Sequence, residues 1–244
     1  DSVYAYDADS GALLAHVSLL GAGETSSDDR GCGQVTPEIG ITATPVIDRA
    51  AGADGTLYVV AMSKAGSGNY YQRLHALDLV TLADRVPPQT IQASAAGGGP
   101  NSSGGLLQFD PKQYKERAAL LLSGGQVYLA FASHCDITPY NGWSIADEDN
   151  ARAQTQVLKI TPKGTDGAIW DTGGMAADSA GSIYAAVGNG TFDTTLDANG
   201  MPAQQDFGNA ALNLTSSGGK LAVADYFTPF NTVSQSAADV DFGS

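Results

Sequence analysis

The chain has 244 residues, of which 43% are hydrophobic and only 16% charged, and it contains 30 glycines. Its 12 Lys and Arg stand against 26 Asp and Glu, so the formal net charge of -14 repels nucleic-acid phosphates and anionic lipid headgroups. This composition favours a turn-rich all-β protein over long charged helices and makes nucleic acid and membrane surfaces poor partners. We expect no transmembrane helix and no signal peptide, because no run of about eighteen apolar residues occurs and the first residues lack a leader pattern.

The N-terminal region predicts a hairpin. Residues 2–7 alternate between apolar and polar side chains, residues 8–11 form a turn ending in Gly11, and residues 12–20 form a second strand. We interpret residues 1–20 as half of a four-stranded unit. A loop rich in Gly, Ser and Asp follows over residues 21–40 and carries Cys32.

The first complete unit is predicted over residues 41–93. Its second strand is apolar on both faces, as expected for a strand covered on each side. The expected strands are residues 41–48, 56–62, 72–79 and 89–93.

A long segment rich in Gly, Ser and Asn, residues 95–117, separates the first unit from the second. Loops of this length are uncommon in compact domains unless they are functional or mobile. The second unit spans residues 118–161, with strands expected at 118–122, 126–132, around 143–146, and 155–161.

The third unit spans residues 175–226 and is followed by a polar tail, residues 227–244. Its strands are expected at 175–177, 182–187, 209–214 and 220–226.

The same strand-turn-strand grammar recurs at a spacing of about 55 to 70 residues. This repeat predicts an all-β fold, a β-propeller of four-stranded antiparallel blades, with about three complete blades and a half blade. Propellers close with roughly four to eight blades, so we expect further blades or another copy to cover the open edges.

The repeats resemble those of the pyrroloquinoline-quinone (PQQ) repeat proteins, whose quinoprotein alcohol dehydrogenases are β-propellers. The family signature Ala-x-Asp-x-x-Thr-Gly is most similar to Ala-Tyr-Asp-Ala-Asp-Ser-Gly at residues 5–11. A second copy keeps Ala76, Asp78 and Thr81. The resemblance covers nearly the whole chain, although each repeat is degenerate.

The resemblance also implies a cofactor site. Trp170 matches the tryptophan that stacks on PQQ, and Asn189, in Gly-Asn-Gly, matches an asparagine ligand of Ca²⁺. The family draws its catalytic base from an aspartate near the end of this region, for which the candidates are Asp239 and Asp241. Asp193 in the same loop as Asn189 is a further candidate metal ligand.

Two departures from the family pattern bear on that site. The Thr-Pro-His-Asp segment is Thr-Pro-Phe-Asn at residues 228–231, and the loop expected to supply a glutamate ligand reads Ser-Lys-Ala-Gly-Ser-Gly at residues 63–68. Losing a carboxylate and gaining Lys64 both weaken Ca²⁺ binding, because Ca²⁺ affinity depends on anionic oxygen ligands.

Simpler explanations exist for the same residues. Trp170 follows Ile169 and could be core packing. Asn189 and Asp193, like Asp197, Asn199 and Asp206, could chelate Ca²⁺ through hard oxygens or form turns beside Gly190 and Gly200.

The two cysteines, Cys32 and Cys135, lie in loops expected on one face of neighbouring blades. We therefore predict a disulfide between them, which would indicate an oxidising compartment. The expected location is periplasmic or extracellular, in a secreted bacterial protein.

Three functions are open. The first is a binding or scaffold module with a degenerate cofactor site, whose long loops on one face hold a small-molecule, glycan or protein ligand. The second is a PQQ- and Ca²⁺-dependent alcohol or sugar dehydrogenase. The third is a Ca²⁺-dependent hydrolase of the lactonase kind, by analogy of fold alone.

Overall fold

The computed structural model describes residues 1–148 and 153–242. Residues 149–152 of the second expected blade and residues 243–244 of the expected tail lie outside the described residues. Within the described ranges the strands form antiparallel sheets. One 3₁₀ turn, His134–Asp136, lies between β13 and β14, and one α-helix, α1 (Thr232–Ala237), follows the last strand.

The chain begins with a two-stranded hairpin of β1 (Ser2–Tyr6) and β2 (Leu13–Ser18). The Asp7 carboxylate accepts hydrogen bonds from the backbone N–H (2.7 Å) and hydroxyl (2.6 Å) of Ser10. Gly11 adopts a φ of 71°, a conformation that glycine tolerates best. The predicted hairpin and its turn are therefore present.

The second sheet has the strand order β4-β3-β6-β7-β8. Two short strands, β5 and β3, pair with the same edge of β6, one after the other along its length. β5 pairs with the start of β6, and β3 pairs with its end. Residues 21–40 were expected to be a loop, but they supply β3 and β4, which was not apparent from their Gly- and Ser-rich composition. The bounds are β3 Glu24–Asp28, β4 Glu38–Ile39, β5 Val46–Asp48, β6 Thr56–Ala65, β7 Tyr70–Asp78 and β8 Gln89–Thr90.

The middle sheet repeats this plan. β12 pairs with the start of β13 and β11 pairs with its end, and β14 and β15 complete the order β11-β13-β14-β15. The segment 95–117, expected to be a loop, contributes β11 and most of a small β9–β10 sheet. The bounds are β9 Ser94–Ala96, β10 Leu106–Gln108, β11 Tyr114–Glu116, β12 Leu121–Ser123, β13 Gln126–Ser133, β14 Trp143–Glu148 and β15 Gln154–Lys159.

The last sheet has the order β16-β17-β18-β19. Its strands are β16 Ala176–Ala177, β17 Ile183–Ala186, β18 Ala211–Ser217 and β19 Lys220–Phe227. The expected polar tail contains α1. The buried Asn209 fastens the residues after α1 to the last sheet. Its side chain donates to the Val240 carbonyl (3.1 Å) and accepts from the Phe242 N–H (2.5 Å).

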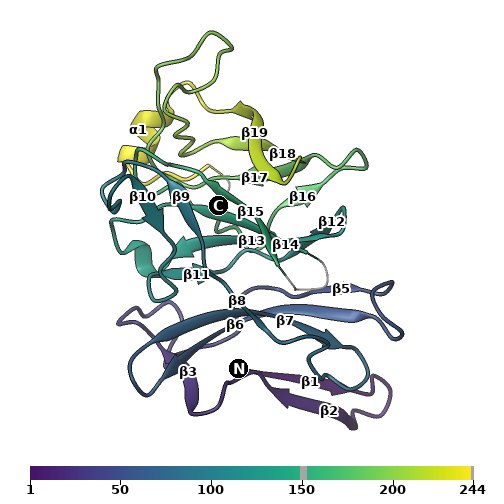
Figure 1. Ribbon diagram of the computed structural model, residues 1–244. Helices are drawn as coiled ribbons and strands as arrows, with labels where there is room; N and C mark the ends of the chain where they lie inside the picture. The colour runs from purple at the N-terminus through teal and green to yellow at the C-terminus, as the bar shows by residue number, and fades with distance from the viewer. Residues whose placement is uncertain (149–152, 243–244) are drawn as a thin grey trace.

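Apart from the small β9–β10 sheet, the sheets stack face to face from β1–β2 at one end to β16–β19 at the other (Figure 1). Strand alternation explains the stacking. On β6, Val59 and Ala61 pack toward the first hairpin, whereas Tyr58 and Val60 pack toward the middle sheet. On β13, alternate side chains likewise serve two cores. Each inner sheet is thus covered on both faces, as the apolar runs predicted.

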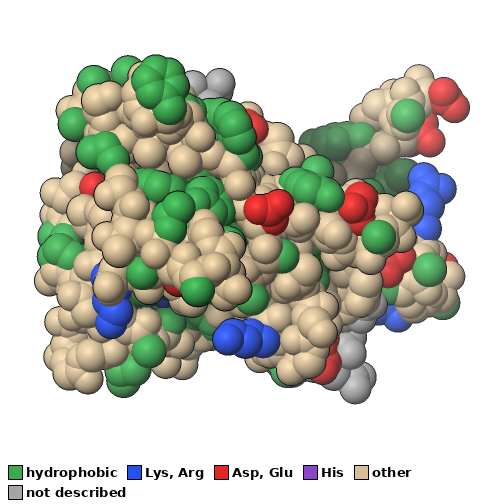
Figure 2. Space-filling view, turned by 90° about the horizontal axis from the view of Figure 1, so that it is seen from above, with side chains coloured by type: hydrophobic (Ala, Val, Ile, Leu, Met, Phe, Trp, Pro, Cys, Tyr) green, Lys and Arg blue, Asp and Glu red, His purple; other side chains and the backbone are tan. Residues whose placement is uncertain are grey.

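The two end faces of the stack are exposed. Tyr4 and Tyr6 lie on the outer side of the first hairpin, and Tyr184 and Phe227 lie on the outer side of the last sheet. Figure 2 views the molecule from the latter end and shows hydrophobic side chains gathered there. Within the described residues, the sheets form an open stack and do not close into a ring, so the repeated antiparallel units are observed and a closed propeller is not.

Candidate functional site

Four of the residues singled out from the sequence line one pocket of about 160 Å³: Trp170, Asn189, Asp239 and Asp241. They come from the segment before β16, the loop after β17 and the segment after α1. The remaining lining residues are Gln34, Lys115, Arg117, Ala132, Ser133 and Asp136. The pocket therefore lies where the ends of β11 and β13 meet loops of the second and last sheets.

Asn189 holds both aspartates in place. Its backbone N–H donates to Oδ1 of Asp241 (2.6 Å), and its side-chain Nδ2 donates to Oδ1 of Asp239 (2.6 Å). The Asn189 carbonyl accepts from the Gly167 N–H (2.8 Å), which fixes the loop from the opposite side. Asp239 and Asp241 thus sit side by side at one wall of the pocket.

Trp170 forms part of another wall and carries the Arg117 guanidinium over its ring, with Cζ 5.1 Å from the ring centroid. Such a contact is a favourable cation–π interaction. A Cβ added at Gly188 would lie 2.4 Å from Nε1 of Trp170 and 2.9 Å from Oδ1 of Asp241. Only glycine permits this approach, so the Gly-Asn-Gly sequence brings the indole and the carboxylate together.

Lys115 supplies a second positive charge, although its side chain is almost completely buried. Its Nζ donates to Oε1 of Gln34 (2.7 Å). Burial lowers the pKa of Lys115, and the neighbouring Arg117 charge lowers it further, while Asp136 acts in the opposite direction.

The predicted disulfide joins Cys32 to Cys135, with 5.8 Å between the Cα atoms and a sequence separation of 103 residues. Gln34 follows two residues after Cys32 and also accepts from the Cys135 N–H (3.4 Å). Asp136 comes next in the chain. The disulfide therefore fastens two pocket residues, Gln34 and Asp136, from two different sheets.

Two uncharged side chains, His134 and Tyr140, lie close to the disulfide and Asp136. Burial lowers the pKa of His134 to about 4, with Lys115 and Arg30 adding to the effect, so its imidazole is neutral near pH 7. Burial raises the pKa of Tyr140 well above its usual value, and its hydroxyl donates to Oδ1 of Asp136 (3.0 Å).

Asp193 does not line the pocket. Its two carboxylate oxygens accept from the backbone N–H groups of Thr195 (2.9 Å) and Gln204 (2.7 Å), which closes a loop beyond β17. The Asp197 carboxylate accepts from the backbone N–H groups of Asn199 and Met201 and so stabilises the turn in which it lies. These contacts match the turn-forming explanation, and the structure does not bring Asp193 to Asn189.

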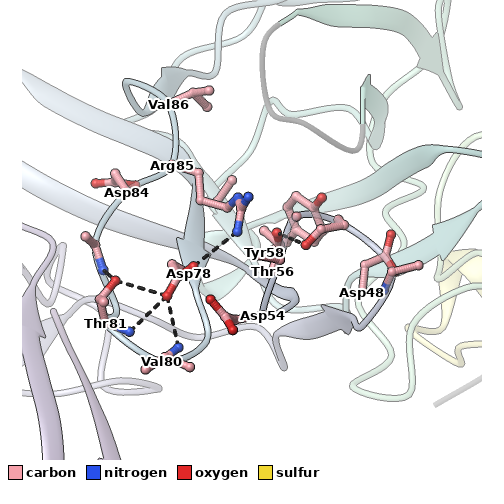
Figure 3. Close-up of a pocket in the computed structure, with 16 residues that line it drawn as sticks. Asp48, Asp54, Thr56, Tyr58, Asp78, Val80, Thr81, Asp84, Arg85 and Val86 are labelled. Atoms are coloured by element: carbon pink, nitrogen blue, oxygen red, sulfur yellow. Dashed lines mark hydrogen bonds and ion pairs between the residues drawn. The ribbon is translucent and has the colours of Figure 1, made fainter.

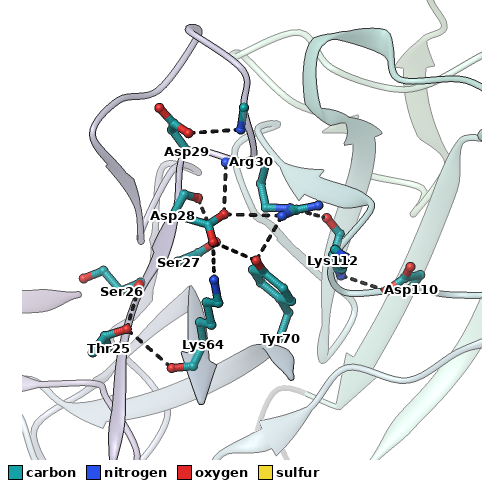
Figure 4. Close-up of polar contacts among 11 residues, drawn as sticks. Thr25, Ser26, Ser27, Asp28, Asp29, Arg30, Lys64, Tyr70, Asp110 and Lys112 are labelled. Atoms are coloured by element: carbon teal, nitrogen blue, oxygen red, sulfur yellow. Dashed lines mark hydrogen bonds and ion pairs between the residues drawn. The ribbon is translucent and has the colours of Figure 1, made fainter. Parts of the chain in front are cut away.

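Lys64 lies in a separate cluster around Tyr70 rather than in the pocket (Figure 4). It bonds Asp28, which also accepts from the Tyr70 hydroxyl (2.8 Å) and forms an ion pair with Arg30 (3.3 Å). These donors hold the pKa of Asp28 far below its usual range, with the Lys64 contact contributing most.

A larger cavity of about 830 Å³ lies between the turns that follow β5 and β7 (Figure 3). Two of its carboxylates, Asp48 and Asp78, take part in local structure. Asp78 accepts from the N–H groups of Val80 and Thr81 and pairs with Arg85, and Asp48 accepts from the Ala50 N–H. None of the residues singled out for chemistry lines this cavity, so we place the candidate site in the smaller pocket.

The residues of that pocket do not fit the calcium–quinone centre that the resemblance implies. Within the described ranges, no group of three or more His, Cys, Asp or Glu side chains is placed to hold a metal ion. Ca²⁺ takes about six to eight oxygen ligands, whereas this pocket also contains the ammonium of Lys115 and the guanidinium of Arg117. A volume of about 160 Å³ is also below the roughly 300–1,000 Å³ typical of drug-sized ligands, and Arg117 already covers one side of Trp170.

Sequence reasoning missed the cationic side of the pocket. Arg117 directly precedes a predicted inner strand, at the face where the loops gather, so its place could have been found. Lys115 and Gln34 gave no such signal, because both were assigned to loops. Lys115 lies in strand β11 of the middle sheet, and Gln34 lies between β3 and β4 of the second sheet.

No protein-family model and no curated protein sequence matches the chain. Among solved structures, a quinohemoprotein alcohol dehydrogenase from Pseudomonas putida is similar to it, with a TM-score of 0.52 at 15% sequence identity. The similarity covers 93% of this chain but 31% of that protein. At this identity the comparison shows the fold alone, which is the fold of a quinoprotein alcohol dehydrogenase segment.

Proposed function

We propose that the chain is part of a quinoprotein-related β-propeller and acts as a binding module, with its ligand in the pocket beside Trp170. The observation that supports this most directly is the charge arrangement. Lys115 and Arg117 face the same small space as Asp136, Asp239 and Asp241, and no ion pair joins any of them within the described residues. Charged groups held apart around a cavity are suited to a polar ligand that bridges them.

The same arrangement argues against alcohol oxidation. A dehydrogenase of the calcium–quinone type needs a base to remove the alcohol proton, a step worth about 10²–10⁴-fold in rate. Asp241 lies against the Asn189 N–H and Asp239 against its side-chain amide, so both carboxylates act as structural acceptors. The positive charges nearby disfavour the divalent cation that would activate the alcohol.

Thermal-shift and dye-reduction measurements on one preparation test this proposal. We expect PQQ with Ca²⁺ to give no reduction of an artificial electron acceptor with alcohols or sugars. We expect small polar ligands to raise the melting temperature of the wild type but not of Trp170→Ala. Dye reduction that requires both additions and is lost in Trp170→Ala would contradict the proposal.

A second candidate is a PQQ- and Ca²⁺-dependent dehydrogenase, favoured by one observation. Trp170, Asn189, Asp239 and Asp241 were chosen by resemblance to that family, and they line one pocket. Equilibrium dialysis against ⁴⁵Ca²⁺ with and without PQQ separates the two candidates. Binding of one Ca²⁺ that depends on Asp241 favours the dehydrogenase, and its absence favours the binding module.

The disulfide and the exposed end faces support two further parts of the proposal. A disulfide persists in an oxidising environment, so we place the protein in the periplasm or outside the cell. No helix of the described residues is long and apolar enough to cross a membrane. The exposed aromatic residues at both ends of the stack are suited to further blades or another copy.

A further inference from the structure

We infer that the pocket takes a small hydroxy acid, a ligand with one carboxylate and several hydroxyl groups, of the sugar-acid class. This inference rests on the proposed binding function and names its ligand. Three observations support it: a cationic side, an anionic side, and an indole between sheets that provides a platform.

The cationic side consists of Lys115 and Arg117. Lys115 makes one hydrogen bond, to the uncharged Gln34 side chain, which leaves donor capacity on its ammonium. The Arg117 guanidinium makes no hydrogen bond or ion pair within the described part of the chain, and only the Trp170 ring accompanies it. A guanidinium presents several donors in a planar fork that suits a carboxylate. The ligand carboxylate therefore belongs at this side.

The anionic side consists of Asp239 and Asp241. One oxygen of each carboxylate accepts from Asn189, and the other oxygen has no hydrogen-bond partner among the residues that the structure describes. A carboxylate oxygen accepts hydrogen bonds and cannot donate them, so the complementary ligand groups are donors. Hydroxyl groups provide such donors without the desolvation cost of a cation.

Size and shape restrict the ligand further. The pocket volume of about 160 Å³ is well below the roughly 300–1,000 Å³ of pockets that hold drug-sized ligands. This space is suited to one sugar-sized molecule rather than to a polymer or a fused-ring cofactor. Trp170 adds an apolar surface against which the C–H groups of such a molecule can pack.

Titration calorimetry with D-glucuronate, D-glucose and acetate tests the inference. D-glucose has the hydroxyl groups without the carboxylate, and acetate has the carboxylate without the hydroxyl groups. We expect D-glucuronate to bind at least about tenfold more tightly than either, because each control loses charged hydrogen bonds on one side. Equal affinity for D-glucose and D-glucuronate would overturn the acid assignment, and equal affinity for acetate would overturn the hydroxyl assignment.

Variants locate the binding. Arg117→Gln should weaken D-glucuronate by about tenfold or more and leave D-glucose unchanged, whereas Asp241→Asn should weaken both. Lys112→Gln is the matched control, since Lys112 lies over the Tyr70 ring outside the pocket. Arg117→Lys keeps the charge, so partial recovery of D-glucuronate binding excludes a folding defect. An unchanged affinity in Arg117→Gln would overturn the inference.

The two proposals fail differently. If D-glucuronate, D-gluconate and lactate all fail to bind, the ligand class is wrong. If D-glucose binds as well as D-glucuronate and Trp170→Ala abolishes both, the ligand class is wrong and the binding function stands. Dye reduction with PQQ and Ca²⁺ would instead overturn the binding function itself.

Discussion

The second and middle sheets share one plan but treat buried charge in opposite ways. In each sheet, two short strands pair with one edge of the first long strand, β6 or β13. A second long strand, β7 or β14, pairs with its other edge. The second sheet pairs its ionisable side chains. The middle sheet buries three of them, Glu116, Asp147 and Lys159, without a hydrogen-bond partner among the described residues.

In the second sheet, Arg73 bonds Glu24 through two nitrogens, each 2.7 Å from a carboxylate oxygen. The Ser63 hydroxyl donates to the same carboxylate (2.7 Å). These donors, Arg73 foremost, lower the pKa of Glu24 to about 2. Glu24 is therefore ionised throughout the physiological range.

In the middle sheet, burial alone raises the pKa of Asp147 to about 7 and lowers that of Lys159 to about 6. Burial also raises the pKa of Glu116 well above its usual value. Lys159 lies 3.6 Å from the Trp143 ring centroid, a contact that favours the charged amine and partly opposes burial. Burial outweighs this contact, because Lys159 is only 6% exposed.

The comparison shows that two sheets of one plan can either keep their ionisable side chains charged or make their charge depend on pH. Paired groups keep their charge, whereas unpaired buried groups become neutral because desolvation disfavours the charged form. Stability should therefore respond to pH through different residues in the two sheets.

The largest expected effect comes from the disulfide that ties the two sheets together. Replacing both Cys32 and Cys135 by Ser should lower the free energy of unfolding by about 2–5 kcal/mol, because a long unfolded loop is no longer constrained. Urea denaturation without reductant measures the loss. The wild type with reductant is the control and should match the variant. Equal stability of variant and oxidised wild type would show that the sheets hold together without the bridge.

Asp147→Asn should give the next largest effect. The folded-state pKa is raised, so the protonated carboxyl contributes stability that is present below its unfolded value near 4 and lost as the pH rises through about 7. At pH 8 the variant should be more stable than the wild type by about 2–4 kcal/mol, and at pH 4 the two should be alike. Denaturation across this range with exposed Asp225→Asn as control checks it. A constant difference at every pH would contradict the assignment.

Lys159→Met should show the opposite pH dependence to Asp147→Asn, because the wild type loses stability here as the pH falls. The folded-state pKa is depressed to about 6, so the unfolded chain binds an extra proton between about pH 6 and 10 and the native state loses stability as the pH falls through that range. At pH 7 we expect the variant to be about 1–3 kcal/mol more stable, since the Trp143 contact offsets part of the cost. Lys220→Met, on the exposed start of β19, should show no such window.

Much of the fold could be predicted from the sequence, because short apolar runs such as residues 56–62, bounded by turn residues, indicate strands that are covered on both faces. The short flanking strands could not. β3 and β11 lie in Gly-, Ser- or Lys-containing segments without alternation, and they are strands because an already formed β6 or β13 offers them hydrogen bonds. Such pairing depends on tertiary context rather than local propensity.

The candidate site divides in the same way. Resemblance brought out Trp170, Asn189, Asp239 and Asp241, which the structure brings together. It also brought out Asp193, which lies elsewhere because its carboxylate closes a local turn. Arg117 could have been placed, because it directly precedes a predicted inner strand, but Lys115 could not, since its approach depends on how β11 packs beside β13.

The smallest effect should come from the paired charges of the second sheet. Glu24→Gln should lower stability by about 1–2 kcal/mol at pH 7, because Arg73 then keeps its charge with only a neutral acceptor. The folded-state pKa is lowered, so the contribution is present above the unfolded value near 4.5 and is lost as the pH falls toward 2. Wild type and variant should therefore converge in acid. Arg85→Gln is the control: its ion pair with Asp78 is more exposed, and screening by water should leave no measurable change. A loss in Arg85→Gln as large as that in Glu24→Gln would mean that burial does not distinguish the two pairs.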